Sequence, residues 1–210
     1  QNGTDGHVQL QTVQGDFTSQ YEPSAHLYAL SGPWNIHALG TYQLQAKGKE
    51  DIRSQRNYAS STNAFLSEAK NEHRLHSETF RLGTVYAPNE RNSLGMEGEY
   101  SHEADRYPTW SESSLMADGQ QLATEGSYRQ REQNRHYAVT FNLAHQLDSL
   151  GSALKFIADY TLKQTRGNNR YESCYMWSQL ITLDSLYRNQ TASDYGIFTA
   201  DMQWLQVGRR

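Results

Sequence analysis

Short turn signals recur along this chain about every 58 residues, and each is followed by an alternating run that reaches a tyrosine. The turns fall at Ser31-Gly32-Pro33, at Pro88 to Asn92, at Asp148 to Gly151 and at Val207-Gly208. The runs are Trp34 to Tyr42, Ser93 to Tyr100 and Ala153 to Tyr160, which places their tyrosines 58 (100 − 42) and 60 (160 − 100) residues apart. This regular hairpin spacing predicts an antiparallel up-and-down sheet.

The clearest strand is predicted at Trp34 to Lys47, where apolar and polar residues alternate over 14 residues with one exception, Leu39. Such a strand would be roughly 45 Å long, whereas the usual globular strand has about five or six residues. The same alternation returns at residues 80–86, 94–101, 136–144, 154–163 and 197–204. With two weaker pieces, His7 to Val13 and Ser24 to Ser31, the sequence predicts an all-β meander of about eight long strands.

Three polar connections lie between these strands, at Gly48–Ser67, His102–Leu122 and Gln164–Gln190. Loops longer than about 15 residues are uncommon in compact domains. We therefore expect short turns on one side of the sheet and long loops on the other. Bacterial outer-membrane barrels have this asymmetry, with short periplasmic turns and long external loops.

The composition favours a sheet with one apolar and one polar face, because hydrophobic residues make up only 36% of the chain while aromatics reach 11%. The polar face would carry His37, Arg81, Glu97, Glu99, Lys155, Asp159 and Asp201. Alternation alone fits a soluble sandwich with its apolar face inside or a barrel in lipid with that face outside. Strand length, loop asymmetry and the aromatics beside the short turns (Trp34, Tyr86 and Trp204) favour the barrel.

Net charge, hydropathy and cysteine content argue against several other classes of protein. The net charge of −4 argues against nucleic acid as a partner. No segment approaches the 18 or more apolar residues of a membrane helix. The single cysteine, Cys174, excludes an intrachain disulfide framework.

No catalytic or metal-binding pattern stands out among the titratable residues. His73 and His76 are three apart, which in a strand directs them to opposite faces, and no cysteine or carboxylate joins them at a metal-ligand spacing. Glu97 and Glu99 share a face, and an acid–base pair could be built that way, but any polar barrel wall gives the same spacing. We expect no enzymatic activity, no metal and no cofactor.

Aromatic residues in the polar connections are the candidate ligand-binding residues. Exposed tyrosine and tryptophan side chains form platforms in many sugar and peptide sites. The alternative is that these loops pack on their own aromatics. The candidates are Tyr107, Trp110, Tyr171, Tyr175 and Trp177.

Four phrases carry a resemblance to a known family: SGPWNIHALGTYQLQ, FRLGTVYAPNERNSLGMEGEY, SALKFIADYTLK and SDYGIFTADMQWLQ. A Gly-x-x-Tyr ahead of a Pro-Asn turn and a late Asp-Tyr strand resemble the barrel of TonB-dependent-receptor-like outer-membrane proteins of the Bacteroides type. The likeness covers nearly the whole chain. It implies a bacterial outer-membrane location and nutrient uptake driven through TonB after a plug domain shifts.

The chain departs from that family in lacking a plug domain, a TonB box and an aromatic C-terminal residue, since it ends Gly208-Arg209-Arg210. We therefore expect residues 1–210 to be one mid-barrel segment. The resemblance implies outer-membrane lipid and the parent's plug domain as partners, with a nutrient ligand or a surface lipoprotein at the loops. An isolated segment would cover its apolar face by folding into a sandwich or by self-association. The alternative is a small self-contained eight-strand barrel or soluble sandwich with a binding or structural role.

Overall fold

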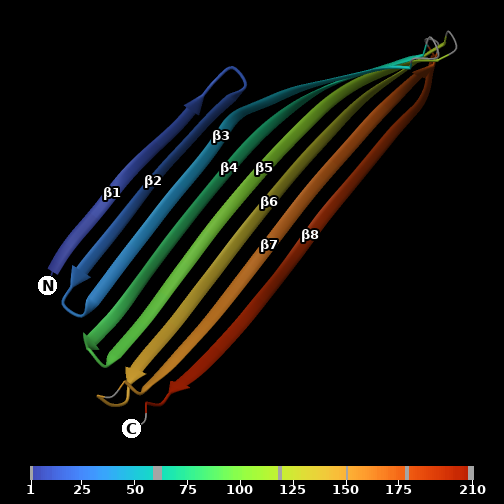
Figure 1. Cartoon of the computed structure of the whole chain (residues 1–210). Coiled ribbons are helices and arrows are strands. Elements are labelled where there is room, and N and C mark those ends of the chain that lie inside the picture. The colour runs from blue at the N-terminus through green and yellow to red at the C-terminus, as the bar shows by residue number, and fades with distance from the viewer. Residues whose placement is uncertain (1, 59–62, 118–119, 150, 178–179, 208–210) are drawn as a thin grey trace.

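The computed structural model describes residues 2–58, 63–117, 120–149, 151–177 and 180–207, and within these ranges every regular element is a β-strand. The eight strands are shown in Figure 1. In chain order they are β1 (Asn2–Gln14), β2 (Thr18–Ser31), β3 (Trp34–Asn57), β4 (Ala64–Asn89), β5 (Asn92–Ala117), β6 (Gln120–Gln146), β7 (Ala153–Trp177) and β8 (Leu180–Leu205).

Each strand pairs antiparallel with its neighbours in sequence, so the sheet has the order β1-β2-β3-β4-β5-β6-β7-β8 (Figure 1). β1 and β8 are its two edges and do not pair with each other, which leaves the sheet open. The predicted all-β meander of eight long strands is confirmed. This single open sheet is neither a closed eight-strand barrel nor a two-layer sandwich.

Short turns join the strands where the sequence predicts them. Gly32, between β2 and β3, has φ +57°, a left-handed conformation that glycine adopts without strain. Between β4 and β5, the side-chain oxygen of Asn89 accepts hydrogen bonds from the backbone N–H groups of Arg91 and Asn92, both at 3.0 Å. The fourth predicted turn, at Val207-Gly208, extends beyond the described residues.

The long loops predicted at Gly48–Ser67, His102–Leu122 and Gln164–Gln190 are wrong, because the described parts of these segments are paired strands. β3 and β4 remain in register out to Asn57 and Ala64. β5 and β6 remain paired out to Ala117 and Gln120. Strands β3 to β8 consequently have 24 to 27 residues each.

Polar segments form strands here because backbone hydrogen bonds between neighbours do not depend on an apolar face. Cross-strand charge pairs add to the pairing. Lys49 Nζ lies 3.8 Å from Glu72 Oε1, and Arg53 Nη2 lies 2.5 Å from Glu68 Oε1. Both faces of these extensions are polar, so the period-two hydrophobic signal disappears while the strand continues.

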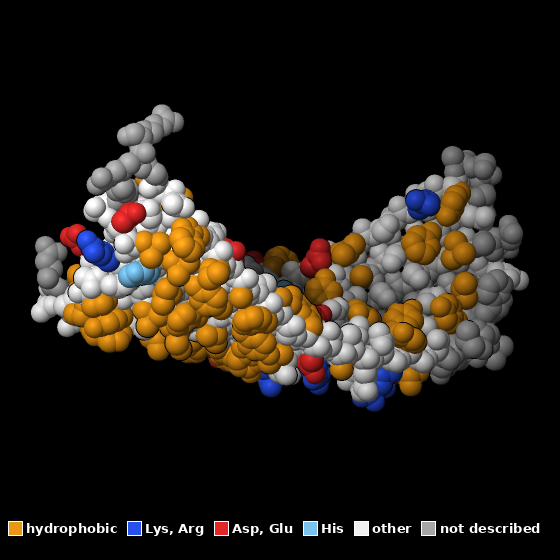
Figure 2. Space-filling model, turned by 90° about the horizontal axis from the view of Figure 1, so that it is seen from below, with side chains coloured by type: hydrophobic (Ala, Val, Ile, Leu, Met, Phe, Trp, Pro, Cys, Tyr) orange, Lys and Arg blue, Asp and Glu red, His pale blue; other side chains and the backbone are white. Residues whose placement is uncertain are grey.

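The two faces of the sheet differ in chemistry and in exposure. Residues that lie directly opposite one another on successive strands form a register row across the sheet. One such row on the apolar face consists of Leu27, Ala38, Leu82, Gly98, Val139, Tyr160 and Phe198, from β2 to β8. Along residues 129–140 of β6, odd-numbered residues on this apolar face are exposed and even-numbered residues on the polar face are half-buried. No hydrophobic side chain of the described residues is buried. Figure 2 shows hydrophobic side chains gathered on the side away from the hollow of the molecule.

Candidate functional site: a polar face opposite an apolar band

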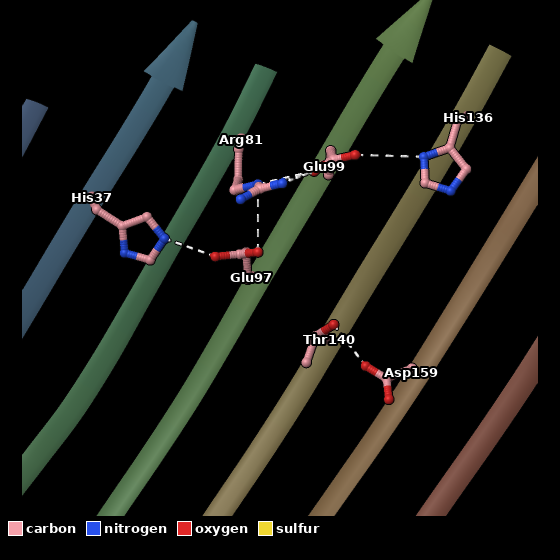
Figure 3. A network of polar contacts seen from close by, with 7 residues as sticks. All are labelled: His37, Arg81, Glu97, Glu99, His136, Thr140 and Asp159. Atoms are coloured by element: carbon pink, nitrogen blue, oxygen red, sulfur yellow. Dashed lines mark hydrogen bonds and ion pairs between the residues drawn. The ribbon is translucent and has the colours of Figure 1, made fainter. Parts of the chain in front are cut away.

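A network of charged and polar side chains spans β3 to β7 on the polar face (Figure 3). His37 of β3 reaches across β4, and its Nε2 lies 2.8 Å from Glu97 Oε2 of β5. Since a carboxylate only accepts hydrogen bonds, the imidazole donates in this contact. The contact therefore joins two strands that are not neighbours in the sheet.

Arg81 of β4 is the centre of the network. Its Nε donates to Glu99 Oε2 at 2.9 Å, and the same nitrogen lies 3.6 Å from Glu97 Oε1. The other oxygen of Glu99 lies 3.6 Å from His136 Nδ1 of β6 (Figure 3). One arginine thus holds two carboxylates that would otherwise repel each other at positions i and i+2 of one strand.

Contacts between polar side chains of neighbouring strands continue across β6 to β8, where no arginine takes part. Thr140 donates from Oγ1 to Asp159 Oδ1 at 2.7 Å, and Thr199 of β8 lies 3.5 Å from Asp159 Oδ2. His37, Thr140, Asp159 and Thr199 belong to one register row through Gly83 and Glu97. The polar face is therefore organised across the sheet and not only along single strands.

Gly83 is the residue that lets His37 reach Glu97. It lies between them in the register row, and a Cβ at this position would overlap the His37 ring. Glycine here permits close approach of a side chain to the β4 backbone.

We expect Gly83→Ala to displace the His37 ring, break its hydrogen bond with Glu97 and lower the free energy of unfolding by about 1 kcal/mol. Gly98→Ala is the matched control, because a Cβ on Gly98 meets no atom within 4 Å. Denaturant titration of the two variants measures the difference. Equal stability of both variants would show that the His37–Glu97 contact contributes nothing.

An apolar band covers the opposite face at the short-turn end of strands β2 to β8. On β3 apolar residues continue to Leu44, but the rows level with Tyr42 and Leu44 carry Glu78, Arg135, Arg166 and Asp194 on β4 to β8. The band shared by these strands therefore runs on β3 from Trp34 to Gly40, six residues (40 − 34), or about 20 Å along the strand. At the 35–45° tilt of barrel strands this corresponds to about 15 Å of height. Aromatic contacts lie near both ends of the band: Trp34 with Tyr86 at 4.6 Å between ring centroids, and Tyr100 with Tyr137 at 5.2 Å.

The chemistry available to the polar face is that of a hydrated wall. The side chains of Arg81 and Glu97 are 43% and 38% exposed, so their charges are screened by water. Among the described residues, no group of three or more His, Cys, Asp or Glu side chains is placed to hold a metal ion. Such a surface is hydrated and carries charges of both signs.

The five aromatic candidates all lie in strands. Tyr107 of β5 and both Tyr171 and Tyr175 of β7 are on the polar face, and the Tyr107 ring lies 5.8 Å from that of His73. Trp110, 44% exposed, is on the opposite face. Trp177 ends β7, and its side chain is outside the described part of the chain. The loop placement is wrong because the hairpins extend through these residues, and the structure does not bring the five together on one surface.

Alternation in the sequence places the network residues on one face but does not reveal their contacts. His37 and Glu97 are 60 residues apart, and only the strand register brings them together. One signal in the sequence could have indicated this contact: Gly83, a lone glycine in a predicted strand, where a side chain can approach the backbone closely.

No family model and no curated protein matches the chain. Among solved structures, the chain is weakly similar to OmpT, an outer-membrane protein of Vibrio cholerae, with 12% identity, a TM-score of 0.28, and coverage of 96% of this chain and 64% of OmpT. CarO of Acinetobacter baumannii gives 9% identity, a TM-score of 0.22, and coverage of 80% and 82%. The ferric-catecholate import receptor Fiu of E. coli gives 7% identity, a TM-score of 0.22, and coverage of 95% and 46%.

The chain therefore spans less than two thirds of OmpT and less than half of Fiu. At these TM-scores the likeness carries no information about ligand or activity. In the described ranges, no helix has the length and apolar content needed to cross a membrane.

Proposed function

We propose that this chain is part of the wall of a β-barrel in the bacterial outer membrane, belonging to a TonB-dependent nutrient-uptake receptor of the Bacteroides type. The observation that carries the proposal is the exposure of the apolar face. Leu82 is 63% exposed, Phe198 68% and Met202 71%, all in the row-by-row band described above. Exposed apolar patches of this extent mark a membrane or protein interface.

The aromatic borders of the band support lipid as the medium around it. Aromatic girdles at the two interfaces are typical of outer-membrane barrels. In this arrangement the hollowed polar face lines the lumen, and the His37–Glu97–Arg81–Glu99 network faces water or a plug domain. The unpaired edges of β1 and β8 would pair with further strands of the wall, because exposed edges are otherwise sites of aggregation.

The extended hairpins would project beyond the lipid on the side away from the short turns. Tyr107, Tyr171 and Tyr175 would then face the mouth of the lumen, where a nutrient ligand or a surface lipoprotein could contact them. The proposed role is binding and passage without catalysis, and assays on a panel of ester and glycoside substrates test that part.

A second candidate follows from the same exposed band. A second copy of the chain could cover the apolar face in water, which would give a soluble binding or structural protein. In such an assembly the band would be a protein–protein interface and would never meet lipid.

Size-exclusion chromatography with light scattering, with and without a mild detergent, tests the proposal. We expect large oligomers in water that detergent resolves into protein–detergent monomers, because detergent replaces lipid on the band. A defined soluble dimer that detergent leaves unchanged would favour the second candidate. A soluble monomer that ignores detergent would contradict both.

A further inference from the structure

Beyond the apolar band, on the same face and away from the short turns, arginines of neighbouring strands lie directly opposite one another. One register row joins Arg74 of β4, Arg106 of β5 and Arg131 of β6. Another row joins Arg129 of β6, Arg170 of β7 and Arg188 of β8. These six side chains form the arginine belt. Arg131 is six residues (137 − 131) from Tyr137, and an even offset along a strand keeps both residues on one face.

The belt concentrates positive charge that carboxylates of the protein neutralise only in part. Arg74 Nη2 lies 3.5 Å from Glu72 Oε2, and Arg170 donates to Glu172. In the described part of the chain, no carboxylate forms an ion pair with the other four members, Arg106, Arg129, Arg131 and Arg188. All six arginines are exposed.

Like charges directly opposite each other destabilise a pair of strands. A lysine or histidine could relieve the repulsion by losing its proton, but arginine stays charged in proteins. Glu172 lies ten residues (172 − 162) beyond Leu162, the last apolar residue of the band on β7. The hydrogen bond from Arg170, and then the charges of Arg170 and Arg129, hold the pKa of Glu172 below its ordinary value. The belt therefore favours anions at this height.

The geometry of arginine and the position of the belt indicate the kind of anion. The planar guanidinium fork binds phosphate through two parallel hydrogen bonds. The row through Arg131 lies about 20 Å along the strand from Tyr137, or about 15 Å of height at barrel tilt. The polar zone of a simple phospholipid leaflet is only about 5–8 Å thick. A headgroup that carries phosphates farther out, on sugars, fits the distance.

The apolar band, separated from the belt by two register rows of the same face, is hollowed on the same strands. A hollow of about 880 Å³ is lined by residues of β1 to β6, most of them small, aliphatic or aromatic, with Arg81 and Glu99 among them. Phe80 and Leu82 of β4, Tyr100 of β5, and Tyr137 and Val139 of β6 are in its lining. These are the three strands that carry Arg74, Arg106 and Arg131. An acyl chain seated in this hollow would place its headgroup toward the belt.

We propose that the arginine belt binds the phosphate groups of a membrane glycolipid whose acyl chains lie against the apolar band. This inference rests on the proposed function, since it requires the band to be in a membrane. It assigns to the outer surface of the wall a lipid site separate from the polar face.

The test compares binding of lipopolysaccharide, before and after chemical removal of its phosphates, to the full chain in detergent micelles. The variant Arg106→Gln/Arg131→Gln/Arg188→Gln removes three belt charges. The matched control Arg53→Gln/Arg56→Gln/Arg91→Gln removes three charges from exposed positions outside the belt. We expect the belt variant to bind phosphorylated lipopolysaccharide about tenfold or more weakly, the control variant to bind like the parent, and dephosphorylated lipopolysaccharide to bind the parent weakly.

Separate outcomes distinguish the failure of this inference from the failure of the proposed function. If both variants lost binding equally, the loss would come from the lower net charge, and the assignment of a specific site to the belt would be wrong. Displacement of the lipid by millimolar inorganic phosphate would assign the belt to free anions and overturn the lipid assignment. A chain that enters detergent micelles but binds neither form of lipopolysaccharide would overturn the inference alone. A chain that ignores detergent would overturn the proposed function as well.

Discussion

Replacing Val139 with arginine is expected to lower the free energy of unfolding in lipid vesicles by about 2–4 kcal/mol, the cost of arginine near the midplane of a barrel wall. Val139 is 45% exposed and lies in the middle row of the apolar band, between Gly98 and Tyr160 in register. The cost arises because the guanidinium would have to leave water for hydrocarbon. Urea titration of the vesicle-bound protein, followed by tryptophan fluorescence, measures it.

The adjacent residue provides the matched control. Ala138 lies on the polar face, in register with Glu99, so an arginine there would be in water beside a carboxylate. We expect Ala138→Arg to change stability by less than about 1 kcal/mol. Equal costs for the two variants would mean that the two faces meet the same medium, and the lipid-facing assignment would fail.

Replacing Glu99 with glutamine is expected to lower the free energy of unfolding by about 1–2 kcal/mol, the second-largest effect. Glu99 is 21% exposed, accepts from Arg81 at 2.9 Å and lies 3.6 Å from His136. Glutamine keeps the shape but removes the charge that Arg81 faces. The effect is limited because Glu97, 3.6 Å from Arg81, remains as a partner.

Glu103→Gln is the control for this prediction, since Glu103 lies on the same strand and face, four residues (103 − 99) farther on, and is exposed. It forms no ion pair within the described residues. We expect Glu103→Gln to lower the free energy of unfolding by less than about 0.5 kcal/mol. A Glu99 variant as stable as the Glu103 variant would show that the network on the polar face is only a solvated surface.

Period-two alternation made the fold predictable wherever one face of a strand is apolar. Trp34 to Lys47 and His136 to Ala144 are strands in the structure as predicted, and their alternating apolar residues near the short turns form one band. The short turns were predictable too, since Gly32 and Asn89 are residues that favour tight turns.

The extended hairpins were missed because their two faces are both polar. A different signal was present: charges of opposite sign stand at mirrored positions, so that Lys49 pairs with Glu72 and Arg53 with Glu68 (49 + 72 = 53 + 68 = 121). Reading that symmetry would have extended the hairpin. The arginine belt was missed for the same reason, since Arg106, Arg131 and Arg170 all fall beyond the apolar alternation.

The candidate site was predictable only as a face. Strand register decides which charged residues of this face contact one another. The turns set that register, and no short sequence motif marks it. A bulge between Gln45 and Gly48 shifts β3 against β4 by one residue, so face assignments made from the sequence alone reverse beyond it.

The most direct test of the two-faced wall is the accessibility of nitroxide labels placed singly at residues 136 to 143 of β6, with the one native cysteine, Cys174, replaced by serine. In lipid vesicles, collision rates with oxygen report lipid and those with a water-soluble nickel complex report water. We predict high oxygen collision at 137, 139, 141 and 143, and high nickel collision at 136, 138, 140 and 142. Two profiles that rise and fall together, or odd-numbered labels that meet the nickel complex, would contradict a wall with lipid on one face and water on the other.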